Sequence, residues 1–311
     1  LCGAHVAIDG CFASRGCRDG LRSGKLPAVP FPGTLEQGYG RGALKNGDRE
    51  GPWIIYAQFD TLEAEGWGFS DSNHVDGWHI ESEGEYRDGW REGLWIEYEW
   101  QSGRVDSKGE YKKGEPEGPW VFYHANGQPY LEKVYRDVET DGPWVLSYDD
   151  GQLRTKGEYK NEEREGPWVW YHDDGQLECT GVFKKGKKEE LWVAYHANGE
   201  LLTKGKYKNG EREGFWISYH ENGQLRSKSQ YDDGEYEGPC VEYFDNGQLK
   251  FEGSFANGKL EGTVVSYDED GTEDDRSGIY RDGEKVADLP TVTDEAASLM
   301  ALHPLAAIGT L

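Results

Sequence analysis

Hydrophobic residues are scarce in this sequence, at only 35% of 311 positions, and methionine occurs once. A run of about 18 apolar residues is lacking, so the sequence offers no candidate for a membrane-spanning helix. The low apolar content also argues against a large layered core. The stability of the fold must therefore come from contacts of another kind.

Basic residues are scarce relative to acidic ones. The sequence has 34 Lys and Arg against 59 Asp and Glu, which leaves a formal net charge of −25. Such a charge repels phosphate backbones and anionic lipid, so we expect neither nucleic-acid binding nor membrane insertion. It suits a basic protein partner, cation binding or simply solubility.

Cysteines are few and lack the spacing of a metal or redox site. Cys2, Cys11 and Cys17 cluster near the start, and a disulfide among them stays open. Cys179 and Cys240 replace small or aromatic packing residues, and no CxxC pair occurs. No signal-peptide pattern is visible. A chain that begins at Leu1 is typical of a processed or truncated one, and the compartment is left open.

Aromatic residues, in contrast, are abundant and periodic, with 12 Trp and 19 Tyr. One aromatic position recurs at steps of 24 or 25 residues: Tyr86, Tyr111, Tyr135, Tyr159, Phe183, Tyr207, Tyr231, Phe255 and Tyr280. A fixed period in this range indicates a repeat architecture. Chains built from copies of one unit are more often binding surfaces or scaffolds than catalysts.

Each unit contains two extended runs rich in aromatic and β-branched residues, separated by turn residues. Asn-Gly or Asp-Gly dipeptides, such as Asn209-Gly210 and Asn222-Gly223, favour type I′ hairpin turns. The sequence therefore predicts an all-β fold. We expect an elongated, twisted, single-layer antiparallel β-meander of about ten 24-residue hairpin repeats.

Strand register follows from the turns. Two-residue loops would place Tyr219 opposite Arg226, Ile217 opposite Lys228 and Trp216 opposite Thr203. One face would then carry Trp216, Thr203, Gly205, Tyr207 and Leu201. A three-residue loop would instead shift the pairing by one and swap the faces, because side chains alternate with a period of two.

Three regions are expected along the chain. Residues 1–40 form an irregular head or cap, residues 41–285 the repeat array, and residues 286–311 a tail. The array includes a degenerate repeat at about 57–85. The tail is predicted to hold a short helix at about 294–302, with Thr293 as its N-cap.

Two groups of residues are candidates for binding. Asp268, Asp270, Glu273 and Asp274 offer several carboxylates within a short loop, as Ca²⁺ requires, although Asp-Gly in the same place also simply makes a turn. The tryptophan ladder has two interpretations, a stacked core between hairpins or an exposed interaction surface. Its members are Trp95, Trp120, Trp144, Trp168, Trp192 and Trp216.

Catalytic signatures are missing. His124, His172, His196 and His220 recur once per unit, about 10 Å apart if each unit adds two strands, which is too far for a shared metal. No nucleophilic triad and no phosphate-binding loop is visible. We therefore expect a protein that is not an enzyme and has no cofactor.

The unit Tyr-x-x-Gly-x-x-x-Gly-x-Trp-x-x-Tyr-x-x-x-Gly-x-Leu resembles the bacterial MORN repeat variant, as found in YwqK-family antitoxins. The resemblance covers Leu44 to Gly283. It implies a β-meander used for contact with protein or lipid, and it does not imply a reaction.

The leading hypothesis is a non-enzymatic interaction or scaffold protein that docks a protein partner within a larger assembly. One alternative is an antitoxin-like neutraliser of a basic toxin or effector. Another is the targeting module of a truncated enzyme.

Overall fold

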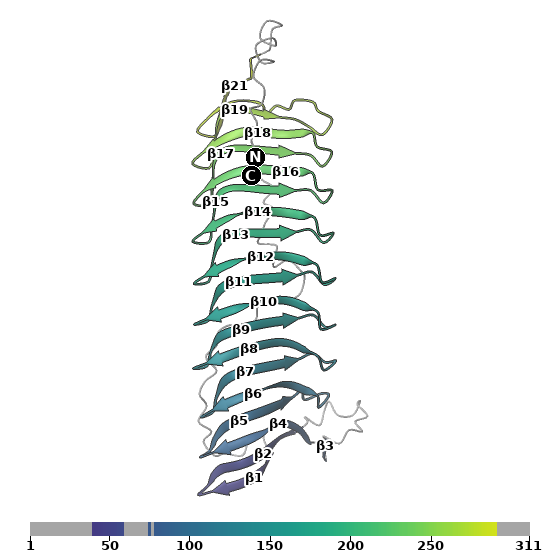
Figure 1. Cartoon of the computed structure of the whole chain (residues 1–311), viewed down its shortest axis with the longest axis vertical. Helices are drawn as coiled ribbons and strands as arrows, with labels where there is room; N and C mark the ends of the chain where they lie inside the picture. The colour runs from purple at the N-terminus through teal and green to yellow at the C-terminus, as the bar shows by residue number, and fades with distance from the viewer. Residues whose placement is uncertain (1–38, 59–73, 76–77, 291–311) are drawn as a thin grey trace. The chain divides into compact units, whose positions relative to one another are not determined.

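The computed structural model describes residues 39–58, 74–75 and 78–290, and all regular structure in them is β-strand (Figure 1). None of these residues forms a helix that is long and apolar enough to cross a membrane. The predicted head over residues 1–40 lies outside this part of the chain except for its last two residues. The predicted helix at about 294–302 lies wholly outside it.

Contacts between Cα atoms divide the chain into two compact units, with strands β1–β13 in one, β15–β21 in the other, and β14 contributing to both. The strands of the first unit are β1 Tyr39–Lys45, β2 Asp48–Gln58, β3 His74–Val75, β4 Trp78–Arg87, β5 Trp90–Tyr98, β6 Val105–Lys112, β7 Glu115–Tyr123, β8 Pro129–Arg136, β9 Glu139–Ser147, β10 Leu153–Lys160, β11 Glu163–Tyr171, β12 Leu177–Lys184 and β13 Lys187–Tyr195. The remaining strands are β14 Leu201–Lys208, β15 Glu211–Tyr219, β16 Leu225–Asp232, β17 Glu235–Tyr243, β18 Leu249–Ala256, β19 Lys259–Ser266, β20 Gly278–Arg281 and β21 Glu284–Ala287.

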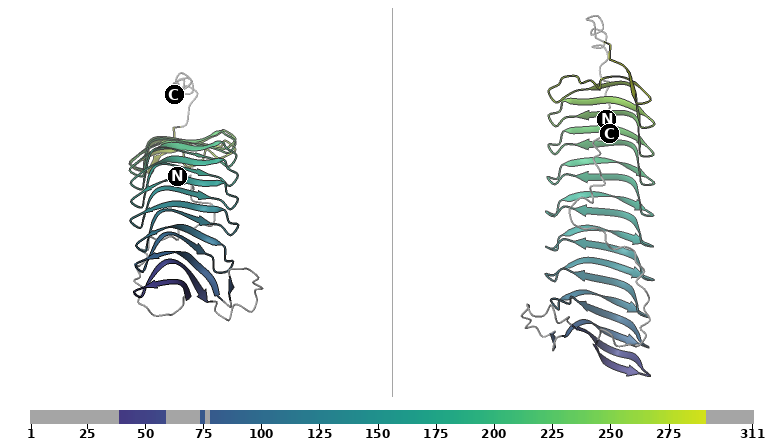
Figure 2. Two further views of the ribbon diagram at one scale, coloured as in Figure 1. Left: turned by 60° about the horizontal axis from the view of Figure 1, so that its bottom comes forward. Right: turned by 180° about the vertical axis from the view of Figure 1, so that it is seen from behind.

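Within each unit the strands form an antiparallel meander. From β4 to β13, and again from β15 to β21, each strand pairs with the next one in sequence (Figure 2). The predicted all-β antiparallel architecture is thus confirmed.

The two ends of the hairpins use different turns. Asn209 and Gly210 have φ values of 55° and 94°, as a type I′ turn requires. At the other end Gly223 alone has a positive φ, of 79°. There the Gly223 N–H donates to the His220 carbonyl oxygen and the His220 N–H donates to that of Gln224, each at 2.9 Å. This is a three-residue loop with a glycine bulge, so the two-residue loop predicted for Asn222-Gly223 is wrong.

The bulge changes the register next to this loop. Ile217 lies opposite Lys228 as predicted, but Tyr219 lies opposite Leu225 and not Arg226. The extra residue sits at the strand end, so the body of the hairpin keeps its expected faces. The predicted pairing is therefore correct for the central residues of the two strands. Only the pair next to the loop is displaced, by one residue.

A second bulge lies before each tryptophan. Lys156 pairs with Val169 whereas Glu158 pairs with Glu165, a shift of two residues. A shift of two moves the partner without changing the face. The equivalent tryptophan Trp216 consequently lies against Gly205, and not opposite Thr203 as predicted.

The face that carries the tryptophans, called the inner face, holds the core. Its tryptophans alternate with the periodic Tyr or Phe residues in edge-to-face contacts at centroid distances of 5–6 Å, for example Tyr86–Trp95 at 5.1 Å and Phe183–Trp192 at 5.1 Å. Such contacts add to the free energy gained by burial. The core is thus a ladder of rings between neighbouring hairpins, which suits a chain with few aliphatic residues.

Glycine makes room for each indole. A Cβ atom added at Gly181 would lie 2.2 Å from the Trp192 ring, and one at Gly157 would lie 2.1 Å from Trp168. The Trp192 indole N–H then donates to the Val182 carbonyl oxygen at 3.3 Å. Glycine, indole and the next carbonyl therefore act as one packing motif that repeats along the sheet.

The segment predicted as a degenerate repeat at about 57–85 lies partly outside the described residues. β2 pairs directly with β4, with Trp53 opposite Gly84 and Gly51 opposite Tyr86, as in a regular unit. The short strand β3 pairs with the start of β4. Among the described residues, β2 and β4 therefore pair as neighbouring strands of a regular unit do.

The turn after β8 holds a β-branched residue in a left-handed conformation. Val138 has a φ of 66°, a left-handed conformation that is unfavourable for a β-branched residue, and its side chain is 46% exposed. We expect Val138→Gly to raise the free energy of unfolding by about 0.5–1 kcal/mol, because glycine adopts this conformation without steric cost.

Chemical denaturation measures the change. Val286→Gly is the matched control, because Val286 is 55% exposed and lies in an extended strand, so its replacement should be neutral or destabilising. A loss of stability for Val138→Gly would contradict the assignment of strain to this turn.

Candidate interaction surface

The predicted tryptophan ladder lies on the inner face and is mostly buried. Trp95, Trp120, Trp168, Trp192 and Trp216 are at most 4% exposed, whereas Trp144 is half-buried. Cations cover several of the rings from one side. The Arg91 guanidinium lies 4.2 Å from the centre of Trp95 and the Lys188 amine 4.8 Å from that of Trp192. These contacts favour the interpretation of the ladder as a stacked core.

The opposite face, called the outer face, presents apolar groups to solvent. One row of residues crosses the strands of the first unit. In it half-buried Val or Ile alternates with exposed Lys or Glu, or with half-buried Thr180. Its apolar members are Ile96, Val121, Val145, Val169 and Val193. Beside it runs an exposed row of Leu94, Pro119, Pro143, Pro167 and Leu191.

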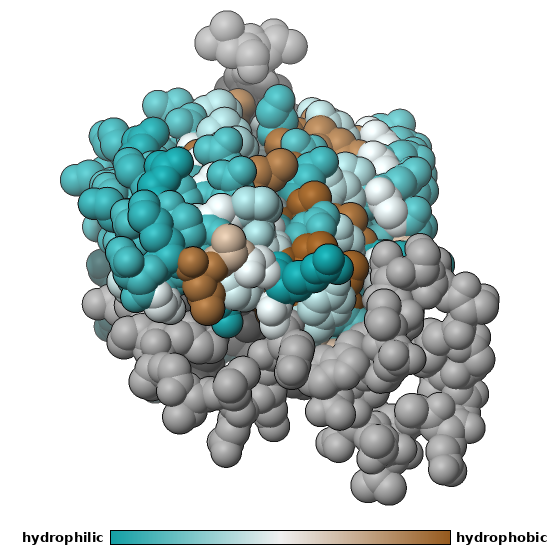
Figure 3. All heavy atoms as spheres, turned by 90° about the horizontal axis from the view of Figure 1, so that it is seen from below, coloured by the Kyte–Doolittle hydropathy of each residue, from teal (hydrophilic) through white to brown (hydrophobic). Residues whose placement is uncertain are grey.

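The second row is the more accessible one. Leu94 is 57% exposed and Leu191 is 51% exposed. In the view of Figure 3, hydrophilic residues cover most of the visible surface and hydrophobic ones lie among them. The members of this row lie on alternate strands, and residues of the intervening strands lie between them, two of which are Glu110 and Glu158. An exposed row of this kind is a candidate protein contact site.

A hollow of about 790 Å³ opens on the outer face where β5, β6 and β7 meet. Tyr98, Lys108 and Tyr123 line it, and the Lys108 amine lies 5.3 Å from the Tyr123 ring centre. Burial, together with a 2.7 Å hydrogen bond from its hydroxyl to Glu83, raises the pKa of Tyr98 to about 12. Tyr98 therefore stays neutral and acts as a hydrogen-bond donor at neutral pH.

Two of the four residues predicted for calcium, Asp270 and Asp274, have carboxylates that are engaged in other contacts. Asp274 accepts hydrogen bonds from Arg276 Nε and Ser266 Oγ, each at 2.9 Å, and these contacts, those of Arg276 above all, lower its pKa to about 2. Hydrogen bonds from Thr272 lower the pKa of Asp270. The other two residues take part through their backbones. Glu273 pairs with Tyr267 in an isolated β-bridge, and the Asp268 backbone carbonyl oxygen accepts the Gly271 N–H, which closes the turn.

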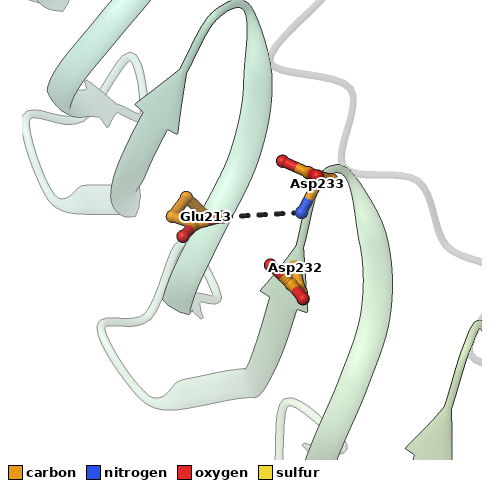
Figure 4. Close-up of side chains that lie close together, drawn as sticks. All are labelled: Glu213, Asp232 and Asp233. Atoms are coloured by element: carbon orange, nitrogen blue, oxygen red, sulfur yellow. Dashed lines mark hydrogen bonds between the residues drawn. The ribbon is translucent and has the colours of Figure 1, made fainter.

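Another acidic group has ligand atoms close together. Among the described residues Glu213, Asp232 and Asp233 have oxygens within 4.8 Å of one another (Figure 4). Glu213 accepts the Asp233 N–H at 3.4 Å, the contact drawn there. Equivalent glutamates cap equivalent turns, as Glu165 does for Lys185 at 2.8 Å. The group is therefore a recurring turn cap and not evidence of a metal site.

The recurring histidines join successive hairpins. A ring nitrogen of His220 lies 2.9 Å from the Tyr243 carbonyl oxygen, and Tyr148, which takes the histidine position in its own unit, donates to the Tyr171 carbonyl oxygen at 2.8 Å. The histidines flank the turns as predicted. They recur once per unit, as residues with a structural role in each hairpin do. The buried thiols Cys179 and Cys240 likewise occupy core positions, at 0% and 2% exposure.

Sequence reasoning did not single out two features. The hollow beside Tyr98 depends on how three strands are placed next to one another, so no local sequence pattern predicts it. Lys133 takes a position that is glycine in most units, and alignment of the repeats on their aromatic residue would have exposed this departure.

The fold and its packing motif define an antiparallel hairpin-repeat protein. In a comparison with family models, the model described as the MORN repeat variant matches the chain at residues 116–137, 140–161, 164–185, 191–209, 212–233 and 236–257. Six segments of the chain are thus similar to this repeat.

Comparison with curated proteins gave no match, so the resemblance to YwqK-family antitoxins depends on the sequence motif alone. Among solved structures, the chain is similar to part of the crystal structure of the GtfA/B complex bound to UDP and GlcNAc. That match has 15% identity and a TM-score of 0.15, and it covers 39% of this chain and 21% of the other.

Proposed function

We propose that this protein is a non-enzymatic interaction or scaffold protein that docks a protein partner on the outer face of its hairpin array. The observation that carries the proposal is the pair of apolar rows on that face, one half-buried and one exposed. Half-exposed aliphatic and aromatic groups on a rigid sheet gain free energy when a partner covers them. MORN repeats are commonly protein-interaction modules, which supports the same assignment.

The charge of the molecule favours a partner with a basic surface. The net charge of −25 raises the rate of encounter with cations and lowers that with anions. Association should therefore weaken as salt is added, since screening shortens the range of the attraction. The apolar rows would supply the affinity, and the carboxylates the selectivity.

Substitution in the exposed row tests the proposal. We expect Leu94→Glu and Leu191→Glu each to weaken capture of the partner from extract of the source organism about tenfold, a change equivalent to about 1.4 kcal/mol. Leu44→Glu is the matched control, because Leu44 is 65% exposed and lies outside the row. Cross-linking with mass spectrometry should place the partner on the outer face. A monomer without partner in native mass spectrometry, or cross-links confined to the inner face, would contradict the proposal.

We also propose, as a second candidate, an antitoxin-like neutraliser of a basic toxin or effector, which the acidic excess favours. Co-expression with the product of a neighbouring gene tests it. Relief of that product's toxicity supports the neutraliser, and unchanged toxicity rejects it.

A further inference from the structure

Lys133 stands where the repeat otherwise has a small residue. It pairs with Trp120 on β7 and with Trp144 on β9. The equivalent residues are Gly84, Gly109, Gly157, Gly181, Gly205, Ser229 and Gly253. At most of these positions the next indole lies flat on the glycine, and a lysine side chain leaves no space for that arrangement.

The exchange loosens the neighbouring tryptophan. Trp144 is half-buried, and it makes no indole hydrogen bond to the described residues of the kind that anchors Trp168 to the Glu158 carbonyl oxygen at 3.2 Å. The ladder of ring contacts is also interrupted here, since no contact joins Tyr135 to Trp144 in this part of the chain. The Lys133 amine lies near both rings, in place of the missing ring contact between Tyr135 and Trp144.

The amine lies among three rings. Lys133 Nζ is 4.3 Å from the ring centre of Tyr135, 5.5 Å from that of Phe122 and 5.8 Å from that of Trp144. Within the described residues it makes no ion pair with a carboxylate. The cation is therefore balanced by ring faces alone, and its charged form lacks the stabilisation that a carboxylate would provide.

The groups that face the amine leave it able to lose its proton. Trp120 and Phe122 on β7 and Trp144 on β9 do not titrate, and Tyr135 has a pKa raised by burial and by Glu97, so it is neutral. Burial lowers the pKa of Lys133 to about 8, against about 10.4 for a free lysine. A substantial fraction of this amine is therefore neutral near pH 7.5.

We propose that Lys133 is a selectively reactive amine, a site at which small aldehydes and related carbonyl compounds add covalently to this protein. The neutral nitrogen donates its electron pair to the carbonyl carbon, and the C=O π electrons move to oxygen. Proton transfer from nitrogen to that oxygen gives a carbinolamine, and loss of water leaves an imine. Carbonyl compound and amine thus give imine and water, and no oxidant or reductant is needed.

The surroundings select the size of the reagent. Lys133 and Trp144 are both only half-buried, while three ring centres lie within 5.8 Å of the amine and confine the space around it. A protonated imine carries its charge where the ammonium lay, over the Tyr135 ring, so the same cation–π contact stabilises it. The site therefore favours a small carbonyl compound.

Labelling of the folded protein tests this proposal. Acetaldehyde at limiting concentration with cyanoborohydride converts each imine to a stable ethylamine, which peptide mass spectrometry locates and counts. The reference is Lys156, an exposed lysine on the outer face of the same unit. At pH 7.5 we expect Lys133 to be labelled about tenfold faster than Lys156, with a pH profile half-maximal near pH 8.

Two controls separate reactivity from folding. Lys133→Arg keeps the positive charge and removes the nucleophile, so the fast adduct should disappear while labelling of Lys156 is unchanged. In urea the two lysines of the wild-type chain should react at equal rates. The proposal is overturned if Lys133 reacts no faster than Lys156 in the folded wild type, or if its rate is half-maximal only at about pH 10, as for a free lysine.

Discussion

Trp192→Ala is expected to lower the free energy of unfolding by about 3–5 kcal/mol, the range for removing a fully buried aromatic side chain. Trp192 is 1% exposed, contacts Phe183 and Tyr207 edge-to-face and donates its indole N–H to Val182. Its loss opens a cavity that interrupts the ring ladder. Because neighbouring hairpins contact each other through such rings, their interface is lost together with the side chain.

Gly181→Ala should be destabilising for the complementary reason, by about 1–3 kcal/mol. The new Cβ atom would lie 2.2 Å from the indole, while the Gly181 backbone is extended and accepts any residue. Combined with Trp192→Ala, the same change should cost far less, because its steric partner is gone. Chemical denaturation followed by circular dichroism measures all three variants.

The double-mutant cycle is decisive because it isolates the contact between the two positions. Leu191→Ala is the matched control, since Leu191 adjoins Trp192 in sequence but is 51% exposed, and it should change stability by no more than about 0.5 kcal/mol. Additive effects of Gly181→Ala and Trp192→Ala on the free energy of unfolding would show that Gly181 is not required to make room for the Trp192 indole.

Removing a whole repeat should be milder than removing one residue. Deletion of Tyr159 to Val182 joins Glu158 to Phe183, which preserves the period and the face of every strand. Deletion of Val169 alone places Trp168 and Trp170, both buried, on opposite faces. Moving one indole into water should cost about 3 kcal/mol or more.

Denaturant midpoints compare the two deletions. The shorter array should keep a midpoint close to that of the wild type, because stability in repeat proteins is approximately a sum of unit and neighbour terms. The Val169 deletion should lower the midpoint clearly. Should the 24-residue deletion unfold the protein while the single deletion is tolerated, the repeat organisation proposed for this chain would be wrong.

Local chemistry accounts for what could be predicted of the fold. The period, the alternation of Trp216, Thr203 and Tyr207 on one face, and the type I′ turn at Asn209-Gly210 all follow from residues a few positions apart. The turn type at Asn222-Gly223 could not be predicted in this way, because the same dipeptide fits two loops of different length. The choice between them depends on how the strand ends pair, which is a property of the hairpin and not of the dipeptide.

The candidate sites divide in the same way. The carboxylates at Asp268 to Asp274 look alike in sequence, and their separate partners, such as Arg276 for Asp274, are decided by the folded loop. The outer apolar row is visible only when strands are laid side by side, because Leu94 and Leu191 are far apart along the chain.

By itself, the sequence determined the all-β repeat architecture and the aromatic face of each strand, because strand periodicity and turn chemistry act over one unit. Only the tertiary structure decided that the tryptophans are covered by cations and neighbouring rings, that β2 pairs with β4, and that Lys133 interrupts the ring ladder. Those outcomes depend on contacts between strands from different units. Packing against a neighbour, and not the propensity of any residue, settles which side chains are buried and which remain free to react or to bind.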